Sequence, residues 1–288
     1  MRYVPLSRKG ELMQFGILGV LEVLVANRRL PIRSANQQIL LALLLCHCGT
    51  VARSGLLIDS LWPDDNGDRA KSRLRLQLHR LRRTLEAAVE ITHESGGYIL
   101  HVSPGSVDAW EFEQLVRRGR QALKAGQVTK GAYLLRTGLG KWRGPALSGL
   151  EDIPFLQRQA ARLDEERMAA LSDRIDADLR LNRPDDLIGE LFALVREYPL
   201  RERLRGQLML ALYQSGRQAE ALKVYRDGWH ILSNDLGLEP SPELRRLEAA
   251  ILASDSSLTL TWHTRGHHTH TNRHEHGKYC LHCSRWHR

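Results

Sequence analysis

The stretch RAKSRLRLQLHRLRRTL, residues 69–85, decides how the first part of this 288-residue chain folds. Leucines recur at Leu74, Leu78, Leu81 and Leu85, and on an α-helix these positions lie within about 60° of one another. Seven of its 17 residues are Lys or Arg, and none is Asp or Glu. The stretch therefore predicts a helix that buries one leucine stripe and exposes only positive charge elsewhere.

The exposed face of this helix has the composition of a nucleic-acid-binding surface. Like charges at i,i+4 repel one another, and bound phosphates would offset that repulsion. Arginine pairs with guanine edges, and leucine contacts the thymine methyl group. We interpret the stretch as a recognition helix in the major groove of double-stranded promoter DNA. The alternative is a basic helix that faces solvent or an acidic protein. The predicted DNA-binding residues are Arg69, Lys71, Ser72, Arg73, Arg75, Leu76, His79, Arg80, Arg82 and Arg83.

The segments around this helix predict an α+β domain. Residues 14–32 favour short strands with a turn at Asn27-Arg28. Ser34 is placed to cap a helix that contains ILLALLL, and Gly49 is placed to end it. Residues 54–61 predict a second helix, stopped at Trp62-Pro63. The order of these elements predicts a helix-turn-helix unit.

A hairpin is predicted directly after the basic helix. In ITHESGGYILHV, residues 91–102, two β-prone runs flank Ser95, Gly96 and Gly97. Such a hairpin would form a wing that lies along the DNA backbone or minor groove. We expect Gly96, Gly97 and Tyr98 to belong to it.

From residue 108 the pattern becomes wholly helical. Asn182, Leu187, Leu191 and Leu194 are followed 34 residues later by Gly216, Ala221, Tyr225 and Gly228. A 34-residue helix–turn–helix period is typical of tetratricopeptide repeats, and a generic helical bundle is the alternative. The predicted helices span 108–125, 128–142, 154–181, 184–197, 201–215, 217–235 and 241–252.

Charge divides the chain in the same way as the periodicity. Residues 1–105 hold 14 Lys/Arg and 9 Asp/Glu, residues 106–253 hold 23 and 22, and residues 254–288 hold 5 and 2. We therefore expect an N-terminal extension (1–12), a winged-helix domain (13–105), a tetratricopeptide-like domain (106–253) and a His-rich tail (254–288). We expect a cytoplasmic protein because the N-terminus lacks an apolar signal core and the longest apolar run is too short to span a bilayer.

The tail contains 8 of the 13 histidines and two of the four cysteines. His276, Cys280, His282 and Cys283 are a weak candidate zinc site because the spacing of the second ligand pair is not that of a zinc finger. A disordered tail is the preferred interpretation. We expect no catalytic residues and no cofactor.

Several motifs together resemble the Streptomyces antibiotic regulatory proteins. They are MQFGILGVLEV (13–23), LLIDSLWPDD (56–65), HRLRRTLE (79–86), GGYIL (96–100), WRGPAL (142–147), PLRERLRGQLMLALYQSGRQAEALKVYR (199–226) and LGLEPSPELRRLEAAIL (236–252). The resemblance implies an OmpR/PhoB-type winged helix followed by a bacterial transcriptional activation domain. It also implies an activator of antibiotic biosynthesis genes that binds promoter direct repeats as a homodimer.

The resemblance further implies a partner, RNA polymerase holoenzyme, contacted through its σ factor and α subunit. The loop with Asp64, Asp65 and Asp68 is then expected to face polymerase. Ser72, Arg73 and His79 depart from the family's usual asparagine, small residue and serine, so the preferred bases are expected to differ. The competing hypothesis is a protein-interaction scaffold with a vestigial DNA-binding domain.

Overall fold

The chain begins with a small antiparallel sheet. The computed structural model describes residues 13–65, 67–85, 89–182 and 184–258. Strands β1 (Met13–Gly16), β2 (Glu22–Val25) and β3 (Arg28–Arg29) pair in sequence order. The turn between β2 and β3 lies at Ala26-Asn27, where both residues have positive φ. The predicted turn at Asn27-Arg28 was one residue late, since Arg28 already pairs with Val25.

Three helices and a hairpin follow. Helix α1 spans Ala35–Cys46, α2 spans Ser54–Leu61 and α3 spans Asp68–Thr84. Strand β4 (Ala52–Arg53) joins the hairpin of β5 (Glu90–Glu94) and β6 (Gly97–His101) in the order β4-β6-β5. The predicted elements are therefore present in the predicted order.

The ends of α1 differ in detail from the prediction. Ser34 is its N-cap residue, but its side chain makes no capping hydrogen bond. The Gln38 side chain instead reaches back and donates to the carbonyl of Ile32. The helix ends at Cys46, and Gly49 takes a left-handed conformation in the turn beyond it. Leu40 to Leu45 are all buried, so α1 is the central helix of this part.

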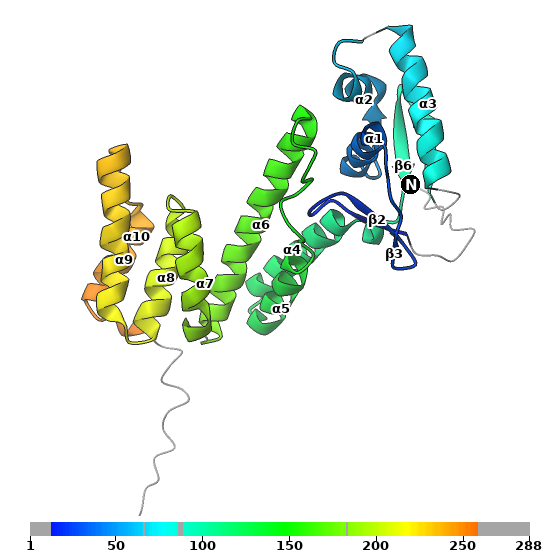
Figure 1. Cartoon of the computed structure of the whole chain (residues 1–288). Helices are drawn as coiled ribbons and strands as arrows, with labels where there is room; N and C mark the ends of the chain where they lie inside the picture. The colour runs from blue at the N-terminus through cyan, green and yellow to red at the C-terminus, as the bar shows by residue number, and fades with distance from the viewer. Residues whose placement is uncertain (1–12, 66, 86–88, 183, 259–288) are drawn as a thin grey trace, which may run out of the picture.

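The second part is helical and extends away from the first (Figure 1). All seven predicted helices are present, with a π-helical turn at Ile231–Asp235 and short 3-10 turns at Pro104–Ser106 and Ser256–Leu258. Their bounds are α4 Asp108–Lys124, α5 Val128–Leu139, α6 Pro154–Arg180, α7 Pro184–Glu197, α8 Glu202–Gln214, α9 Gln218–His230 and α10 Pro242–Leu252.

The 34-residue sequence offset has a structural counterpart. Helices α7 and α9 begin 34 residues apart, at Pro184 and Gln218. Asn182 and Gly216, in the turns before these helices, both have positive φ. Leu187, Leu191 and their counterparts Ala221 and Tyr225 are all buried. The two helices therefore use equivalent positions for their core faces, as expected of degenerate repeats.

One hydrophobic core crosses the predicted boundary between residues 105 and 106. It contains buried leucines from each of α1, α2 and α3, and also Phe112 of α4, Leu135 of α5 and Leu163 of α6. A second core begins at Met168, further along α6, and continues to Ile251 in α10. Packing therefore changes from one core to the other within α6, and α4 and α5 are packed with the N-terminal part.

The strand β1 region joins the two parts. The N–H groups of Ile17 and Leu18 donate to the Asp108 carboxylate at 2.8 and 3.1 Å. The N–H groups of Arg143 and Leu147 donate to the carbonyls of Leu18 and Ile17. The motifs at 13–23 and 142–147 are thus the two sides of one contact.

Candidate nucleic-acid interface

Helix α3 is amphipathic as the sequence predicted. Leu74, Leu78, Leu81 and the C-cap residue Leu85 are each at most 1% exposed and belong to the first core. Ala70 extends the stripe toward the start of the helix and is also buried. The orientation of the helix is therefore fixed by burial of one face, and the opposite face points away from the core.

That opposite face holds most of the predicted DNA-binding residues. Leu76 is 47% exposed and lies among the charged side chains of this face. No Asp or Glu lies between residues 69 and 85. The exposed residues are Arg69, Lys71, Ser72, Arg73, Arg75, Leu76, His79, Arg80 and Arg83.

The seven cations of α3 divide into free and paired groups. The side chains of four of them form no ion pair or hydrogen bond with any residue that the structure describes: Arg69, Arg75, Arg80 and Arg83. Three others are engaged within the protein: Lys71 with Asp68, Arg73 with Asp65, and Arg82 with the carbonyl of Ile91. The sequence alone did not distinguish these two groups.

Arg82 fastens α3 to the hairpin. It is half-buried, and its Nε and Nη2 donate to the Ile91 carbonyl of β5 at 3.1 and 2.7 Å. A charged donor on a backbone carbonyl is one of the stronger protein hydrogen bonds. Arg82 therefore holds α3 against β5, and its guanidinium points toward the sheet and not toward the outer face of the helix.

The wing is formed by the β5–β6 hairpin, with its turn at Ser95 and Gly96. Both residues have positive φ, and Gly96 is exposed at the tip. Gly97 and Tyr98 are buried, so only Gly96 of the three predicted wing residues lies on the surface. A Cβ on Gly97 would lie 2.3 Å from the carbonyl oxygen of Ala52, so this glycine permits the close pairing of β6 with β4.

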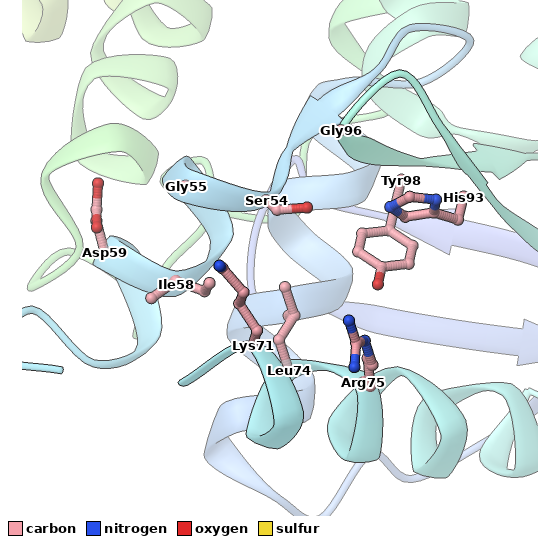
Figure 2. Close-up of a pocket in the computed structure, with 10 residues that line it drawn as sticks. All are labelled: Ser54, Gly55, Ile58, Asp59, Lys71, Leu74, Arg75, His93, Gly96 and Tyr98. Carbon is pink, nitrogen blue, oxygen red and sulfur yellow. The ribbon is translucent and has the colours of Figure 1, made fainter. Parts of the chain in front are cut away.

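A pocket of about 370 Å³ opens between α2, α3 and the wing (Figure 2). Lys71 and Arg75 line it from α3, and Ser54 and Gly55 line it from the first turn of α2. Helix α2 has no acidic residue in its first turn and no side-chain cap. The N–H of Ser54 donates to the Gly96 carbonyl at 3.0 Å, so the N–H groups available to an acceptor are those of the first turn after Ser54. Asp59 is the one acid among the lining residues.

Tyr98 contributes a polar atom to this pocket. The residue is only 7% exposed, its ring packs edge-on against His93, and its hydroxyl points into the pocket beside Arg75 (Figure 2). No hydrogen bond joins that hydroxyl to a described residue. Together with two cations and a helix N-terminus, it forms a cradle suited to an oxyanion. The sequence-based predictions did not include Ser54, Gly55 and His93. The signal that pointed to the first two is the start of α2, which has no side-chain cap.

The three aspartates predicted to face polymerase lie in different surroundings: Asp64 and Asp65 are in the α2–α3 loop, and Asp68 is the first residue of α3. Asp64 is exposed and has no ion pair to a described residue, whereas Asp65 is half-buried and paired with Arg73. The Asp68 side chain is 96% exposed, and a hydrogen bond from Lys71 lowers the pKa of its carboxyl. The three acids are therefore not equivalent as contacts for a partner.

Other kinds of site find little support among the described residues. No group of three or more His, Cys, Asp or Glu side chains lies close enough there to hold a metal ion. The weak zinc candidate of His276, Cys280, His282 and Cys283 lies outside the described residues. None of the described helices has the length and hydropathy needed to cross a bilayer.

Comparison with known proteins supports the resemblance noted in the sequence. The family described as bacterial transcriptional activator domain matches residues 107–252. The regulatory protein DnrI of Streptomyces peucetius is 34% identical over 238 residues, which are 79% of this chain and 87% of that relative. The chain belongs to the Streptomyces antibiotic regulatory protein family. The regulatory protein AfsR of Streptomyces coelicolor is 39% identical over 247 residues, 85% of this chain but 25% of that relative, so the chain spans about a quarter of AfsR.

A solved structure of a related regulator has the same fold as this antibiotic regulatory protein. Mycobacterium tuberculosis EmbR, in complex with a low affinity phosphopeptide, matches with a TM-score of 0.81 and 30% identity. The match covers 87% of this chain and 69% of the EmbR chain. DnrI and AfsR are named as regulatory proteins and EmbR as a transcriptional regulatory protein, in agreement with the expectation that the chain is not an enzyme.

Proposed function

We propose that this chain is a sequence-specific DNA-binding activator of transcription that controls a secondary-metabolite, antibiotic-type gene cluster. It binds direct repeats in promoter DNA as a pair of protomers and recruits RNA polymerase holoenzyme. The observation that carries the proposal is the outer face of α3. It has no Asp or Glu after Asp68, it exposes four unpaired arginine side chains and one leucine, and the buried leucine stripe fixes its orientation.

The middle of this face is proposed to read bases. Arg80, Arg83 and His79 lie opposite the leucine stripe, with Leu76 one turn earlier and Ser72 one turn before that. Arginine pairs in bidentate fashion with guanine, and an exposed leucine suits a thymine methyl group. These side chains would enter the major groove while the buried stripe holds the helix on its domain.

The rim of this face is proposed to hold the DNA backbone. Lys71 and Arg75 line the pocket beside the α2 N-terminus, and the Tyr98 hydroxyl points into the same space (Figure 2). Backbone N–H groups, a hydroxyl and two cations are the usual partners of phosphate oxygens. Arg69, at the start of α3, and Gly96, at the tip of the wing, would contact phosphates of the same DNA strand or of the complementary strand.

The activation step is proposed to use the α2–α3 loop and the helical part. Asp64, unpaired and exposed, is the acid best placed to contact a basic surface of the σ factor or α subunit. Residues 106–253 carry a net charge of only +1, which gives little reason for them to bind DNA. Helical repeats instead present grooves that bind proteins.

The second candidate function is a protein-interaction scaffold whose DNA-binding domain is vestigial. A groove of about 440 Å³ between α6, α8 and α10 favours it. The groove is lined by Leu210, Leu244 and Leu247, with Glu202 and Arg203 at its edge. Such a groove suits a peptide partner but is equally compatible with an activator.

A mobility-shift titration of the full chain separates the two candidates. The probes are promoter fragments from the genes beside its own, each with a base-permuted copy as the control. An activator should prefer the true fragment by about 10³-fold or more. Its affinity should also fall steeply between roughly 50 and 200 mM salt, because phosphate binding releases counterions. Equal affinity for true and permuted fragments would support the scaffold.

A further inference from the structure

Arg73 makes two contacts that turn it away from the outer face of α3. Its guanidinium carbon lies 4.3 Å from the centroid of the Trp62 ring, and its Nη1 lies 3.0 Å from Oδ2 of Asp65. Both partners belong to the loop that follows α2. The N–H of Asp65 also donates to the Trp62 carbonyl at 3.1 Å, so the two partners are joined in one tight turn.

The geometry combines two attractions on one guanidinium. A cation over an indole face is attracted by the ring, and the carboxylate takes up the edge of the same planar group. The Arg73 side chain is 45% exposed and that of Asp65 only 28%, so the ion pair is partly shielded from water. To reach a base, Arg73 would have to give up both contacts.

We infer that Arg73 is a positioning residue that locks loop residues 62–65 onto the recognition helix. The inference deepens the proposed function and rests on it. When Arg73 holds the loop, its guanidinium offsets the negative charge of Asp65, and Asp64 is the acid of the turn that remains unpaired. The direction in which Asp64 points is then fixed relative to α3, and hence relative to the promoter.

This assignment revises the sequence-based prediction that Arg73 contacts DNA. The resemblance leads one to expect a small residue at position 73, and a small side chain cannot reach Trp62 or Asp65. The lock is therefore a feature of this chain's own residues. It separates Arg73 from Arg80 and Arg83, which share its face of the helix but have no partner in the described residues.

Hydrogen–deuterium exchange on the full-length chain tests the lock directly. Arg73→Ala and Asp65→Asn should each speed amide exchange in peptides covering residues 62–65, and Arg73→Lys should restore part of the protection. The double variant should exchange no faster than Arg73→Ala alone, since that change already removes the ion pair that Asp65→Asn weakens. Arg69→Ala, which removes an unpaired arginine of the same helix, is the matched control. Unchanged exchange in both single variants overturns the inference.

Transcription in vitro tests what the lock does. At saturating protein, Arg73→Ala and Asp65→Asn should lower transcript yield by roughly threefold to tenfold, as expected for losing one partly exposed cation–π contact and ion pair. The Kd for promoter DNA should change by less than about threefold, and Arg73→Lys should recover yield.

Two results overturn the assignment. One is a large loss of affinity with a normal yield at saturation, which makes Arg73 a DNA contact. The other is a normal affinity and yield in both variants. If Arg73→Ala fails to fold, Asp65→Asn decides the question. A wild-type chain that does not activate at all counts against the proposed function, while the exchange experiment still judges the lock.

Discussion

Arg143 and Asp108 form an ion pair across strand β1, with 3.0 Å between Nη2 and Oδ2. Asp108 is the first residue of α4, and its carboxylate also accepts the N–H groups of Ile17 and Leu18. Arg143 further pairs with Glu22 of β2. This network holds the N-terminal sheet against the helical part, so the α3 surface and the repeats are held together by specific contacts.

Gly16→Ala should weaken this contact. A Cβ at Gly16 would lie 2.0 Å from Nη2 of Arg143, so the guanidinium must move away from Asp108 and Glu22. We expect the free energy of unfolding to fall by about 1–2 kcal/mol. Gly144→Ala is the control, because a Cβ there meets no atom within 4 Å. Thermal unfolding of both variants checks this, and equal melting temperatures would contradict it.

Gly97→Ala should damage the wing itself. Its Cβ would clash with the Ala52 carbonyl oxygen, a backbone atom that cannot swing aside as an arginine side chain can. A loss of roughly 2–4 kcal/mol in unfolding free energy is expected, in the range of backbone strain and core overpacking. Gly55→Ala in α2 meets no atom and should be neutral or stabilise by about 0.5–1 kcal/mol. Urea unfolding compares the two; a Gly97 variant as stable as wild type would refute this account of the hairpin.

Arg80→Ala and Arg83→Ala should weaken promoter binding without changing stability. Neither side chain has a partner in the described structure, and each should lose about 1–3 kcal/mol of binding free energy and relax the preference for one base pair. Arg118→Ala, an exposed arginine on α4, removes the same charge far along the sequence from α3 and is the control. Titrations against a panel of single-base variants of the binding site measure both effects. Normal affinity in both α3 variants would contradict the proposal that this helix binds in the major groove.

Cys46 should be almost unreactive in the folded protein. Burial raises the pKa of its thiol from 9.0 to about 12, with a smaller opposing effect of Arg162. At pH 8 its thiolate fraction is then on the order of 10⁻⁴, and alkylation requires the thiolate. Because the folded state keeps this proton, Cys46 lowers stability only above pH 9, and increasingly so toward pH 12. Iodoacetamide labelling with peptide mapping compares the two thiols. Cys46 should label more slowly than Cys48, because burial raises the pKa of both thiols but shifts that of Cys46 further.

The periodicity of apolar residues predicted the parts of this fold in which side chains only have to pack into a core. Leu74, Leu78 and Leu81 of α3 are buried and the seven later helices are present, because apolar spacing alone decides which face packs inward. The same reasoning could not assign the arginines. Arg73 and Arg80 both lie opposite the stripe, but only Arg73 has an aromatic ring and a carboxylate from the preceding loop within reach.

Contacts between distant segments were also beyond the sequence. The charge balance and the periodicity change at residue 105, which therefore looked like a domain boundary, whereas the first core continues to Ala170 in α6. Gly97 and Tyr98 look like turn residues beside Gly96, but pairing with β4 buries them. Only the fold shows that β4, which is two residues long, lies beside β6.

Run-off transcription with RNA polymerase holoenzyme tests the central claim most directly. The template is the promoter bound most tightly, and the full-length chain is titrated while occupancy is measured on the same DNA. The account predicts that transcript rises with occupancy, and that Arg80→Ala shifts the curve to higher protein concentration while reaching the same plateau. If transcript stays at its basal level when the promoter is fully occupied, or if the promoter is never specifically occupied, the chain is not the DNA-binding activator proposed.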